Sequence, residues 1–265
     1  MNHLPHLNTR LWQMTACFAS SLDGVIHPIS QIARTPDDNN VKKNWVKLGS
    51  DYDIHHLKSQ RDEHDIILMG ASTFRFYPKA HHGHSSNPPL VIFTRGKSPL
   101  KDIPPDAPAF SSNIKTGAPS TTIFSQALPS KKLQSLYPQT VQWIQLPQTQ
   151  NQSNTGDIDS VDSIDWQTLL TLPPFNTKQR ILFEGGGELF EQLLKAQWID
   201  ALTLTVTPQL LGGVSARPEI KSIHLLGNGD GFLHQKAPKL KLDSKKTRLL
   251  PDTSEIITFY HVTYP

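Results

Sequence analysis

The chain has 265 residues, with 26 Lys and Arg against 23 Asp and Glu, and its net charge of +3 is too small and too dispersed to indicate a nucleic-acid partner. Its single cysteine, Cys17, excludes an intrachain disulfide, a Cys-x-x-Cys redox pair and a multi-cysteine zinc site. No apolar run approaches the roughly 18 residues of a membrane span, and the first residues lack the hydrophobic region of a signal peptide, so we expect a soluble cytoplasmic protein without a membrane partner.

The first half of the chain contains three short apolar segments that predict buried strands. They cover residues 14–19, 65–70 and 89–94, and the last two are nearly continuous apolar runs, as in a sheet covered on both faces. Residues 51–63 predict a helix capped by Ser50 or Asp51, and a short helix starts at Ala71.

The second half continues this alternation of strands and helices. We expect weaker strands near 107–111, 121–124 and 140–146, a helix over 163–170, a strand over 180–184, a helix over 188–198, and strands over 200–207 and 256–262. The alternating basic and apolar residues of 236–248 indicate an exposed edge strand. Together these segments predict an α/β fold with a mostly parallel sheet.

One polar stretch interrupts the pattern. Residues 146–161 are rich in Gln, Asn, Ser and Thr and lack periodicity, which is typical of a surface loop. Because strand-like segments lie on both sides of it, we expect an insertion within a single domain that spans 1–265, with a core over about 14–262.

Three consecutive glycines, Gly185 to Gly187, join the predicted strand at 180–184 to a helix. Glycines let another group approach the backbone closely, and helix N-terminal amides attract an anion, so a dinucleotide diphosphate is the natural ligand. The spacing is not Gly-x-Gly-x-x-Gly, because Leu189 and Phe190 occupy the later positions, and a Rossmann domain is not supported. A tight strand-to-helix turn without a ligand explains the motif equally well.

Two further strand ends carry groups that suit an anion. Gly70 is followed by the hydroxyls of Ser72 and Thr73, and Thr94 is followed by Arg95 and Lys97. Hydroxyl, guanidinium and ammonium groups together suit a phosphate monoester such as the 2′-phosphate of NADPH. Each pattern alone also fits a helix cap or a solvated strand end, but three such ends favour a ligand at the carboxyl edge of the sheet.

Other polar motifs indicate less. His81, His82 and His84 lie in a polar stretch with no predicted strand or helix to fix metal ligands, so we expect no metal site. Asp23 and Gly24 follow the first strand, and such a pair is often no more than a turn.

These landmarks occur in a familiar order. They are Ser21-Leu22-Asp23-Gly24, Trp45, Arg61, Gly70-Ala71-Ser72-Thr73, Glu184-Gly185-Gly186-Gly187 and Thr207-Pro208-Gln209-Leu210-Leu211-Gly212-Gly213. The chain resembles the reductase domain of riboflavin-biosynthesis deaminase–reductases over roughly 14–262, with extra sequence around 98–160. The resemblance implies a dihydrofolate-reductase-like α/β fold with a mostly parallel central sheet, an antiparallel C-terminal strand and helices on both faces. It also implies that NADPH reduces the ribosyl group of 5-amino-6-(5-phosphoribosylamino)uracil to ribityl.

The resemblance and the motifs above together give candidate residues. The candidate cofactor contacts are Ala19, Trp45, Gly70, Thr73, Thr94, Arg95, Gly185, Gly186, Gly187, Glu188 and Leu189. Arg61 and Glu184 match positions that contact substrate in the family, and Asp23 lies in the loop beside it. The candidate catalytic residues are therefore Glu184, which would orient a polar substrate, and Asp23, as a proton relay.

The sequence departs from the family pattern after Thr73. The family continues with Ala-Asp-Asn-Pro and then Leu-Thr-x-Arg, whereas here Tyr77 replaces the cofactor-binding Asp and no Leu-Thr-x-Arg follows. Arg75 or Lys79 would have to replace the arginine that grips the substrate phosphate, and Lys43 stands where a substrate-contacting Ser is usual. The length and the single cysteine predict that the zinc-deaminase domain is absent.

Two functions stay open. The first is an NADPH-dependent reductase of the riboflavin precursor or a related pterin- or pyrimidine-like compound, with hydride transfer to C1′ of the ribosylamino group in the riboflavin case. The second is a non-catalytic or regulatory protein that keeps the fold and binds NADPH. The sequence does not separate these from a reductase of an unrelated carbonyl or imine. The resemblance also implies a homodimer formed through the sheet edge.

Overall fold

The computed structural model describes residues 10–27, 48–79, 81–96, 98–110, 121–148, 164–177, 179–211, 223–225, 232 and 237–265. Trp45, Lys43 and Lys97 lie outside these ranges, as does the predicted polar insertion from residue 149 onward.

The parallel strands of the fold are close to the predicted ones. They are β1 (Gln13–Ser20), β3 (Ile66–Gly70), β4 (Leu90–Thr94), β5 (Thr121–Ser125), β6 (Val141–Gln145), β7 (Arg180–Phe183) and β8 (Ala201–Val206). They lie side by side in the order β8-β1-β7-β3-β4-β5-β6, and each pairs parallel with its neighbour.

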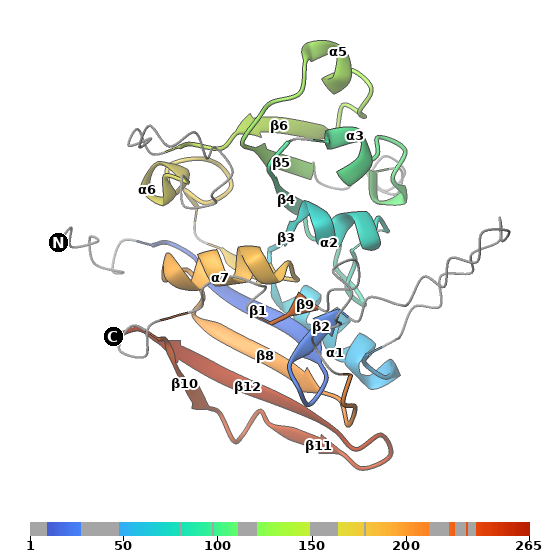
Figure 1. The fold of residues 1–265 in the computed structure, drawn as a ribbon, viewed down its shortest axis with the longest axis vertical. Helices are drawn as coiled ribbons and strands as arrows, with labels where there is room; N and C mark the ends of the chain where they lie inside the picture. Colours follow the sequence, from blue (N-terminus) through green and yellow to red (C-terminus); the bar gives the residue numbers. More distant parts are fainter. Residues whose placement is uncertain are drawn as a thin grey trace, which may run out of the picture.

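Antiparallel strands extend this sheet beyond β8 (Figure 1). They are β10 (Lys239–Leu242), β11 (Arg248–Leu250) and β12 (Glu255–Thr263), and β12 pairs with β8 and with both of the others. In the described residues the sheet thus has ten strands, and β2 (Val25–His27) and β9 (Ile223–His224) form a separate pair. The predicted mostly parallel sheet with an antiparallel C-terminal strand is confirmed, and β10 is the exposed edge strand expected from 236–248.

The helices are α1 (Asp51–Glu63), α2 (Ala71–Phe76), α3 (Pro99–Asp102), α5 (Lys131–Gln134), α6 (Trp166–Leu169) and α7 (Gly187–Lys195). Ser50 caps α1 as predicted, since its hydroxyl accepts a hydrogen bond from the Tyr52 amide at 3.2 Å. The strand expected near 107–111 is wrong over its described residues, because 108–110 form a helical turn. Pro104, Pro105 and Pro108 lack the N–H groups that a sheet ladder needs, which explains the error.

The core lies on both faces of the sheet because successive strand residues point to opposite sides. Along β3, Ile66 and Leu68 join a cluster that includes Leu189, Phe190 and Leu193 of α7. The alternate residues Ile67 and Met69 join a cluster that includes Phe74 of α2. The helices therefore cover both faces, as predicted. This double covering explains why the central strands are almost continuously apolar.

The carboxyl ends of β1, β3, β4 and β7 meet at one edge of the sheet. The backbone continues the pairing just past the strands, since the Gly70 amide donates to the Gly185 carbonyl at 3.1 Å and the Glu184 amide donates to Leu68 at 2.9 Å. Two strand-to-helix turns, one into α2 and one into α7, are thus held side by side at this edge.

Candidate active site

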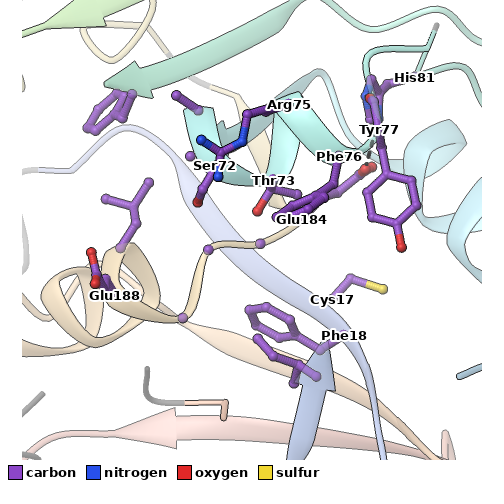
Figure 2. A pocket seen from close by; sticks show the side chains of 18 of the residues that line it. Cys17, Phe18, Ser72, Thr73, Arg75, Phe76, Tyr77, His81, Glu184 and Glu188 are labelled. Atoms are coloured by element: carbon purple, nitrogen blue, oxygen red, sulfur yellow. Dashed lines mark hydrogen bonds and ion pairs between the residues drawn. The ribbon is translucent and has the colours of Figure 1, made fainter. Parts of the chain in front are cut away.

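A cavity of about 1000 Å³ opens at this edge, at the upper limit of typical ligand pockets (Figure 2). Residues from β1, β3, β4, α1, α2 and α7 line it. The predicted site residues among them are Ala19, Arg61, Gly70, Thr73, Thr94, Arg95, Glu184, Gly185, Gly186, Gly187, Glu188 and Leu189. The structure therefore brings together candidates that are up to 170 positions apart in the sequence (Ala19 to Leu189).

The glycine turn packs against Thr73 in the wall of the cavity. Gly185 has a φ of +135° and Gly186 a φ of +103°, which L side chains rarely adopt. A Cβ on Gly185 would lie 3.2 Å from both Cγ2 and Oγ1 of Thr73, and a Cβ on Gly186 would lie 3.7 Å from the Gly70 Cα. Glycine is thus required at both positions for the backbone conformation, and at Gly185 also for the close approach to Thr73.

This turn leads directly into α7, whose first amides have no partner within the helix. The Gly186 carbonyl accepts the first helical hydrogen bond, from Phe190 at 2.8 Å, while the amides of Gly187 to Leu189 lie beside the cavity. Amides at a helix N-terminus and the neighbouring hydroxyl of Thr73 are donors that suit an anionic diphosphate.

Arg95 and Glu188 form an ion pair at the cavity wall. The Nη2 atom of Arg95 lies 2.9 Å from Oε2 of Glu188, and both side chains are substantially exposed. Thr94, buried at the end of β4, accepts a hydrogen bond from the Gly96 amide at 3.1 Å. An exposed pair of this kind contributes little to stability, so Arg95 is available to exchange Glu188 for another anion.

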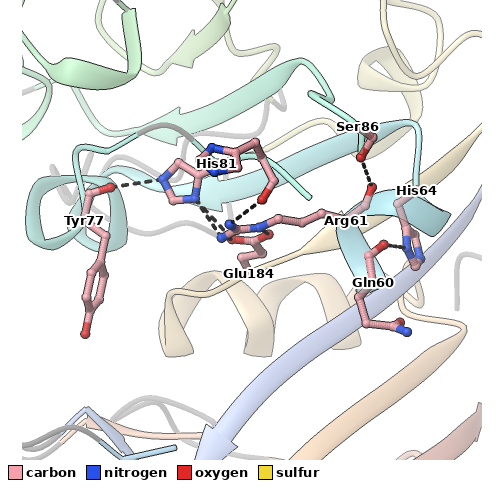
Figure 3. A network of polar contacts seen from close by, with 8 residues as sticks. Gln60, Arg61, His64, Tyr77, His81, Ser86 and Glu184 are labelled. Atoms are coloured by element: carbon pink, nitrogen blue, oxygen red, sulfur yellow. Dashed lines mark hydrogen bonds and ion pairs between the residues drawn. The ribbon is translucent and has the colours of Figure 1, made fainter. Parts of the chain in front are cut away.

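A buried ion pair forms another part of the cavity wall (Figure 3). Arg61 on α1 makes two hydrogen bonds to Glu184, Nε to Oε1 at 2.6 Å and Nη2 to Oε2 at 2.7 Å. The side chains are 11% and 5% exposed. Burial alone favours the neutral acid, but the charge and hydrogen bonds of Arg61 outweigh it and lower the pKa of Glu184 to about 2. The two substrate-binding candidates, Arg61 and Glu184, are thus both ionised and joined by two hydrogen bonds.

Cys17 lies next to this pair, although no motif singled it out as a site residue. The β1–β7 register pairs Ala16 with Phe183, so Cys17 lies beside Glu184 and lines the cavity. Burial and then the negative charges of Asp53 and Glu184 raise the pKa of the Cys17 thiol. The thiol therefore stays protonated and is a small neutral surface of the cavity.

Asp23 lies elsewhere. It does not line the cavity; its Oδ1 accepts hydrogen bonds from the Ser21 hydroxyl and from the Leu211 amide, the latter at 3.2 Å. These contacts join the turn after β1 to the segment that follows β8. The geometry thus gives Asp23 a structural contact and offers no support for its predicted proton-relay role.

The residues that depart from the family pattern do line the cavity. Tyr77, Arg75 and Lys79 all contribute to its wall. Arg75 Nη1 pairs with Asp102 Oδ1 at 2.9 Å, and burial raises the pKa of the Tyr77 hydroxyl, which keeps it protonated. Lys79 has no ion-pair partner among the described residues, which makes it the more available of the two candidate phosphate ligands.

His81 was missed as a site residue. Its ring lies against Arg61 and Glu184, and both His81 and His82 line the cavity. The histidine cluster was visible in the sequence, but its proximity to α1 arises from tertiary packing and has no local signal. In the described ranges no group of three or more His, Cys, Asp or Glu side chains could hold a metal ion. None of the helices there is both long and apolar enough to cross a membrane.

Comparison with known protein families gives a direct match. The RibD C-terminal domain family matches residues 13–249. The chain belongs to this family. Its match covers most of the sheet and every cavity-lining residue. No curated protein sequence matches the chain.

Solved structures share the fold of this RibD C-terminal domain at low sequence identity. The riboflavin biosynthesis reductase Rib7 of Saccharomyces cerevisiae has a TM-score of 0.60 at 16% identity, over 95% of this chain and 90% of that one. RibD of Acinetobacter baumannii has a TM-score of 0.61 at 18% identity, over 95% and 58%. A diaminohydroxyphosphoribosylaminopyrimidine deaminase/5-amino-6-(5-phosphoribosylamino)uracil reductase of Thermotoga maritima has a TM-score of 0.61 at 16% identity, over 97% and 58%. This chain spans little more than half the length of the last two.

Proposed function

We propose that this RibD C-terminal domain protein is an NADPH-dependent reductase of 5-amino-6-(5-phosphoribosylamino)uracil or a closely related pyrimidine. The observation that carries the proposal is that the glycine turn at α7 and the buried Arg61–Glu184 pair line the same cavity. A reductase has to hold a cofactor and a substrate in contact, and this cavity offers each of them a chemically distinct wall.

The glycine turn and the start of α7 fit the diphosphate of the cofactor. Gly185 and Gly186 leave room that a Cβ would fill, and Thr73 and the amides of Gly187 and Glu188 provide donors. When bound there, NADPH supplies the hydride for the reaction. The chain itself contributes binding and orientation, which are the usual roles of the protein in such enzymes.

Arg95 provides the proposed preference for NADPH over NADH. Its guanidinium suits the 2′-phosphate that distinguishes the two cofactors, because such groups form charge-assisted and often bidentate hydrogen bonds with phosphate. Thr94, on the same strand end, would lie next to the adenosine half. The exposed Glu188 is the group that this phosphate would displace from Arg95.

Arg61 and Glu184 bind and orient the substrate in this proposal. With a pKa of about 2, Glu184 is ionised at neutral pH, so it acts as a hydrogen-bond acceptor and cannot donate a proton. We therefore propose Glu184 as an orienting group that fixes Arg61 and accepts from the pyrimidine or sugar, with C1′ of the ribosylamino group as the hydride acceptor. Lys79 is the proposed partner of the substrate phosphate.

The family and its named relatives support a reductase activity. Both the yeast and the Thermotoga proteins are named as reductases, and the Thermotoga protein's name contains the proposed substrate. The changed residues around Tyr77 are the reason why a related pyrimidine is included in the proposal.

Thermal unfolding with NADPH and with NADH is the first test. At a concentration of about 100 Kd, a ligand that binds only the folded protein stabilises it by about 2.7 kcal/mol, so we expect a clear rise in Tm with NADPH and a smaller one with NADH. No rise with either cofactor contradicts the proposal.

Turnover is the second test, measured as the loss of NADPH absorbance on addition of the phosphoribosylaminouracil. Oxidation of NADPH with formation of the ribityl product supports the proposal. NADPH binding without oxidation by this substrate or by related pyrimidines and pterins would favour the alternative of a non-catalytic NADPH-binding protein.

A further inference from the structure

The segment between α2 and β4 is fastened to α1 next to Arg61. The Asp62 carboxylate accepts hydrogen bonds from the amides of His84 at 2.9 Å, Ser85 at 3.0 Å and Ser86 at 2.8 Å. A Cβ on Gly83 would overlap this carboxylate, so the glycine within the histidine cluster is what allows the close approach. The backbone of the cluster is thereby held at a fixed position relative to α1.

This attachment brings the His81 ring to the buried ion pair (Figure 3). Nδ1 of His81 lies 3.1 Å from Nη2 of Arg61 and 3.3 Å from Oε2 of Glu184. Nε2 lies 3.0 Å from the Tyr77 carbonyl oxygen. The side chains of His81, Arg61 and Glu184 are nearly buried, with exposed fractions of 9%, 11% and 5% respectively.

The chemistry of these partners assigns the proton on Nε2 and the acceptor of the neutral ring. A carbonyl oxygen only accepts, so Nε2 carries a hydrogen and donates it to Tyr77. A guanidinium only donates, so in the neutral ring Nδ1 is the acceptor for Arg61, whereas in a protonated ring the Nδ1 hydrogen would be donated to Oε2 of Glu184. The neutral ring thus has a hydrogen-bond partner on both sides and is held in one orientation.

The histidine cluster also determines which N–H of Arg61 is left for a ligand. A guanidinium with its Nε has five N–H donors. Two of them bind Glu184, one faces His81 Nδ1, and one on Nη1 binds the His82 carbonyl at 3.2 Å. One N–H of Nη1 has no acceptor among the described residues, and Arg61 lines the cavity.

We propose that His81 is a positioning residue, which orients Arg61 so that this last N–H is presented to the substrate. The identity of the substrate rests on the proposed function, whereas the orientation of Arg61 by His81 does not depend on it. Without the His81 ring, the guanidinium keeps its two hydrogen bonds to Glu184. It loses the contact between Nη2 and His81 Nδ1, which holds the side of the guanidinium that faces away from Glu184. The expected defect is therefore in substrate binding, with cofactor binding unchanged.

The first test uses the ligand-free protein. In ¹⁵N-labelled protein the Nη2 signals of Arg61 are assigned by their loss in Arg61→Lys. We expect His81→Ala to shift these signals and to speed their exchange with solvent about tenfold or more, because the Nη2 hydrogen that faces His81 loses its acceptor. His84→Ala is the matched control in the same segment, since the His84 ring packs on His55 and only its backbone binds Asp62. An Arg61 signal unchanged by His81→Ala overturns the proposal.

The second test is the kinetics of the same variants. We expect His81→Ala to raise KM for the phosphoribosylaminouracil about tenfold, as for loss of a hydrogen bond to a charged group, with a smaller change in kcat and no change in the Kd of NADPH. His81→Asn, whose amide oxygen can accept from Arg61, should restore KM to within about threefold of wild type. An unchanged KM in His81→Ala, or no rescue by His81→Asn, overturns the proposal. If the wild type itself does not oxidise NADPH with this substrate, the proposed function fails, while the Arg61 signal still decides the role of His81.

Discussion

Arg61 and Glu184 depend on each other because both are buried. Removing one member of such a pair leaves an uncompensated charge inside the protein, which costs about 3 kcal/mol or more. We expect Glu184→Gln to lower the free energy of unfolding by this amount in urea titrations. Glu188→Gln, the same substitution in an exposed pair, should change it by less than about 1 kcal/mol. Equal effects of the two substitutions would contradict the assignment of Glu184 as a buried ion-pair partner.

The low pKa of Glu184 predicts a dependence of stability on pH. Burial alone would raise this pKa, but the Arg61 charge lowers it from the ordinary 4.5 to about 2 in the folded protein. A carboxyl with a lowered folded pKa stabilises above its unfolded pKa, and this contribution is lost as pH falls through the folded value. The stability difference between wild type and Glu184→Gln should therefore shrink between about pH 4.5 and about pH 2. A difference that stays constant over this window, measured by urea titration at each pH, would refute the assignment.

Arg95 is the residue on which we expect cofactor choice to depend. Losing a charge-assisted hydrogen bond to phosphate costs on the order of one factor of ten in affinity or more. Arg95→Gln should thus weaken NADPH binding about tenfold and leave NADH binding unchanged, as measured by calorimetric titration of both cofactors. Equal weakening of both would instead show that the substitution disturbs the wall of the cavity.

At the residue scale, the sequence could predict groups that carry a local pattern and could not predict groups that act through packing. The glycines and Arg95 follow strand ends, and such positions meet at one edge of a parallel sheet. His81 has no pattern of this kind, because its contact with Arg61 depends on how the segment after α2 is fastened to α1. For Asp23 the family resemblance implied a proton relay, whereas the local pair Asp23-Gly24 indicated a turn, and its observed hydrogen bonds to Ser21 and Leu211 fit the local indication.

The turn from β7 into α7 is the element that we expect to be most sensitive to a single methyl group. Gly185→Ala would place a Cβ 3.2 Å from Thr73 and force an alanine to a φ of +135°. Backbone strain of this kind costs about 1–3 kcal/mol. We expect lower stability together with at least about tenfold weaker NADPH binding, because the turn would have to move away from Thr73.

Gly24→Ala is the control for strain without a clash. Gly24 also has a positive φ, of +80°, but a Cβ there meets nothing within 4 Å. It should lower the Tm while leaving the Kd of NADPH unchanged. If Gly185→Ala likewise affected only Tm, the turn would not be part of the cofactor site.

Most elements could be predicted because the spacing of their apolar residues fits only one kind of element in one position, either a strand buried on both faces or a helix with one buried face. The strands buried on both faces are short apolar runs, and α7 presents a clear apolar face. The strand expected near 107–111 was wrong because the buried side chains of Ala109 and Phe110 lie in the helical turn over 108–110, and side-chain burial alone does not distinguish the two conformations. Segments such as 149–163 lie outside the described residues, so the predicted insertion stays a prediction.

At the scale of the whole molecule, the apolar face of the sheet continues past the last strand covered by α7. Leu240 and Leu242 on β10 pair with Val262 and Tyr260 on β12, so these four side chains share one face, and Leu249 on β11 extends it. Leu240, Leu242 and Leu249 are 49%, 48% and 65% exposed. Lysines on β10 disfavour the addition of another strand to this edge, so a partner would pack on the face rather than extend the sheet.

The family resemblance implies a homodimer formed through the sheet edge; we propose instead that the two copies meet through this exposed face next to the edge. Leu242→Asp would place a charge in the centre of the proposed contact and should convert the dimer to a monomer in light scattering after size exclusion. Lys241→Asp changes the neighbouring residue, which points to the opposite face of β10, and it should leave the mass unchanged. A monomeric wild type at micromolar concentrations would contradict the dimer, and a dimeric Leu242→Asp would place the contact elsewhere. Because none of the described cavity-lining residues lies on β10, β11 or β12, we expect the monomeric variant to retain the wild-type Kd for NADPH.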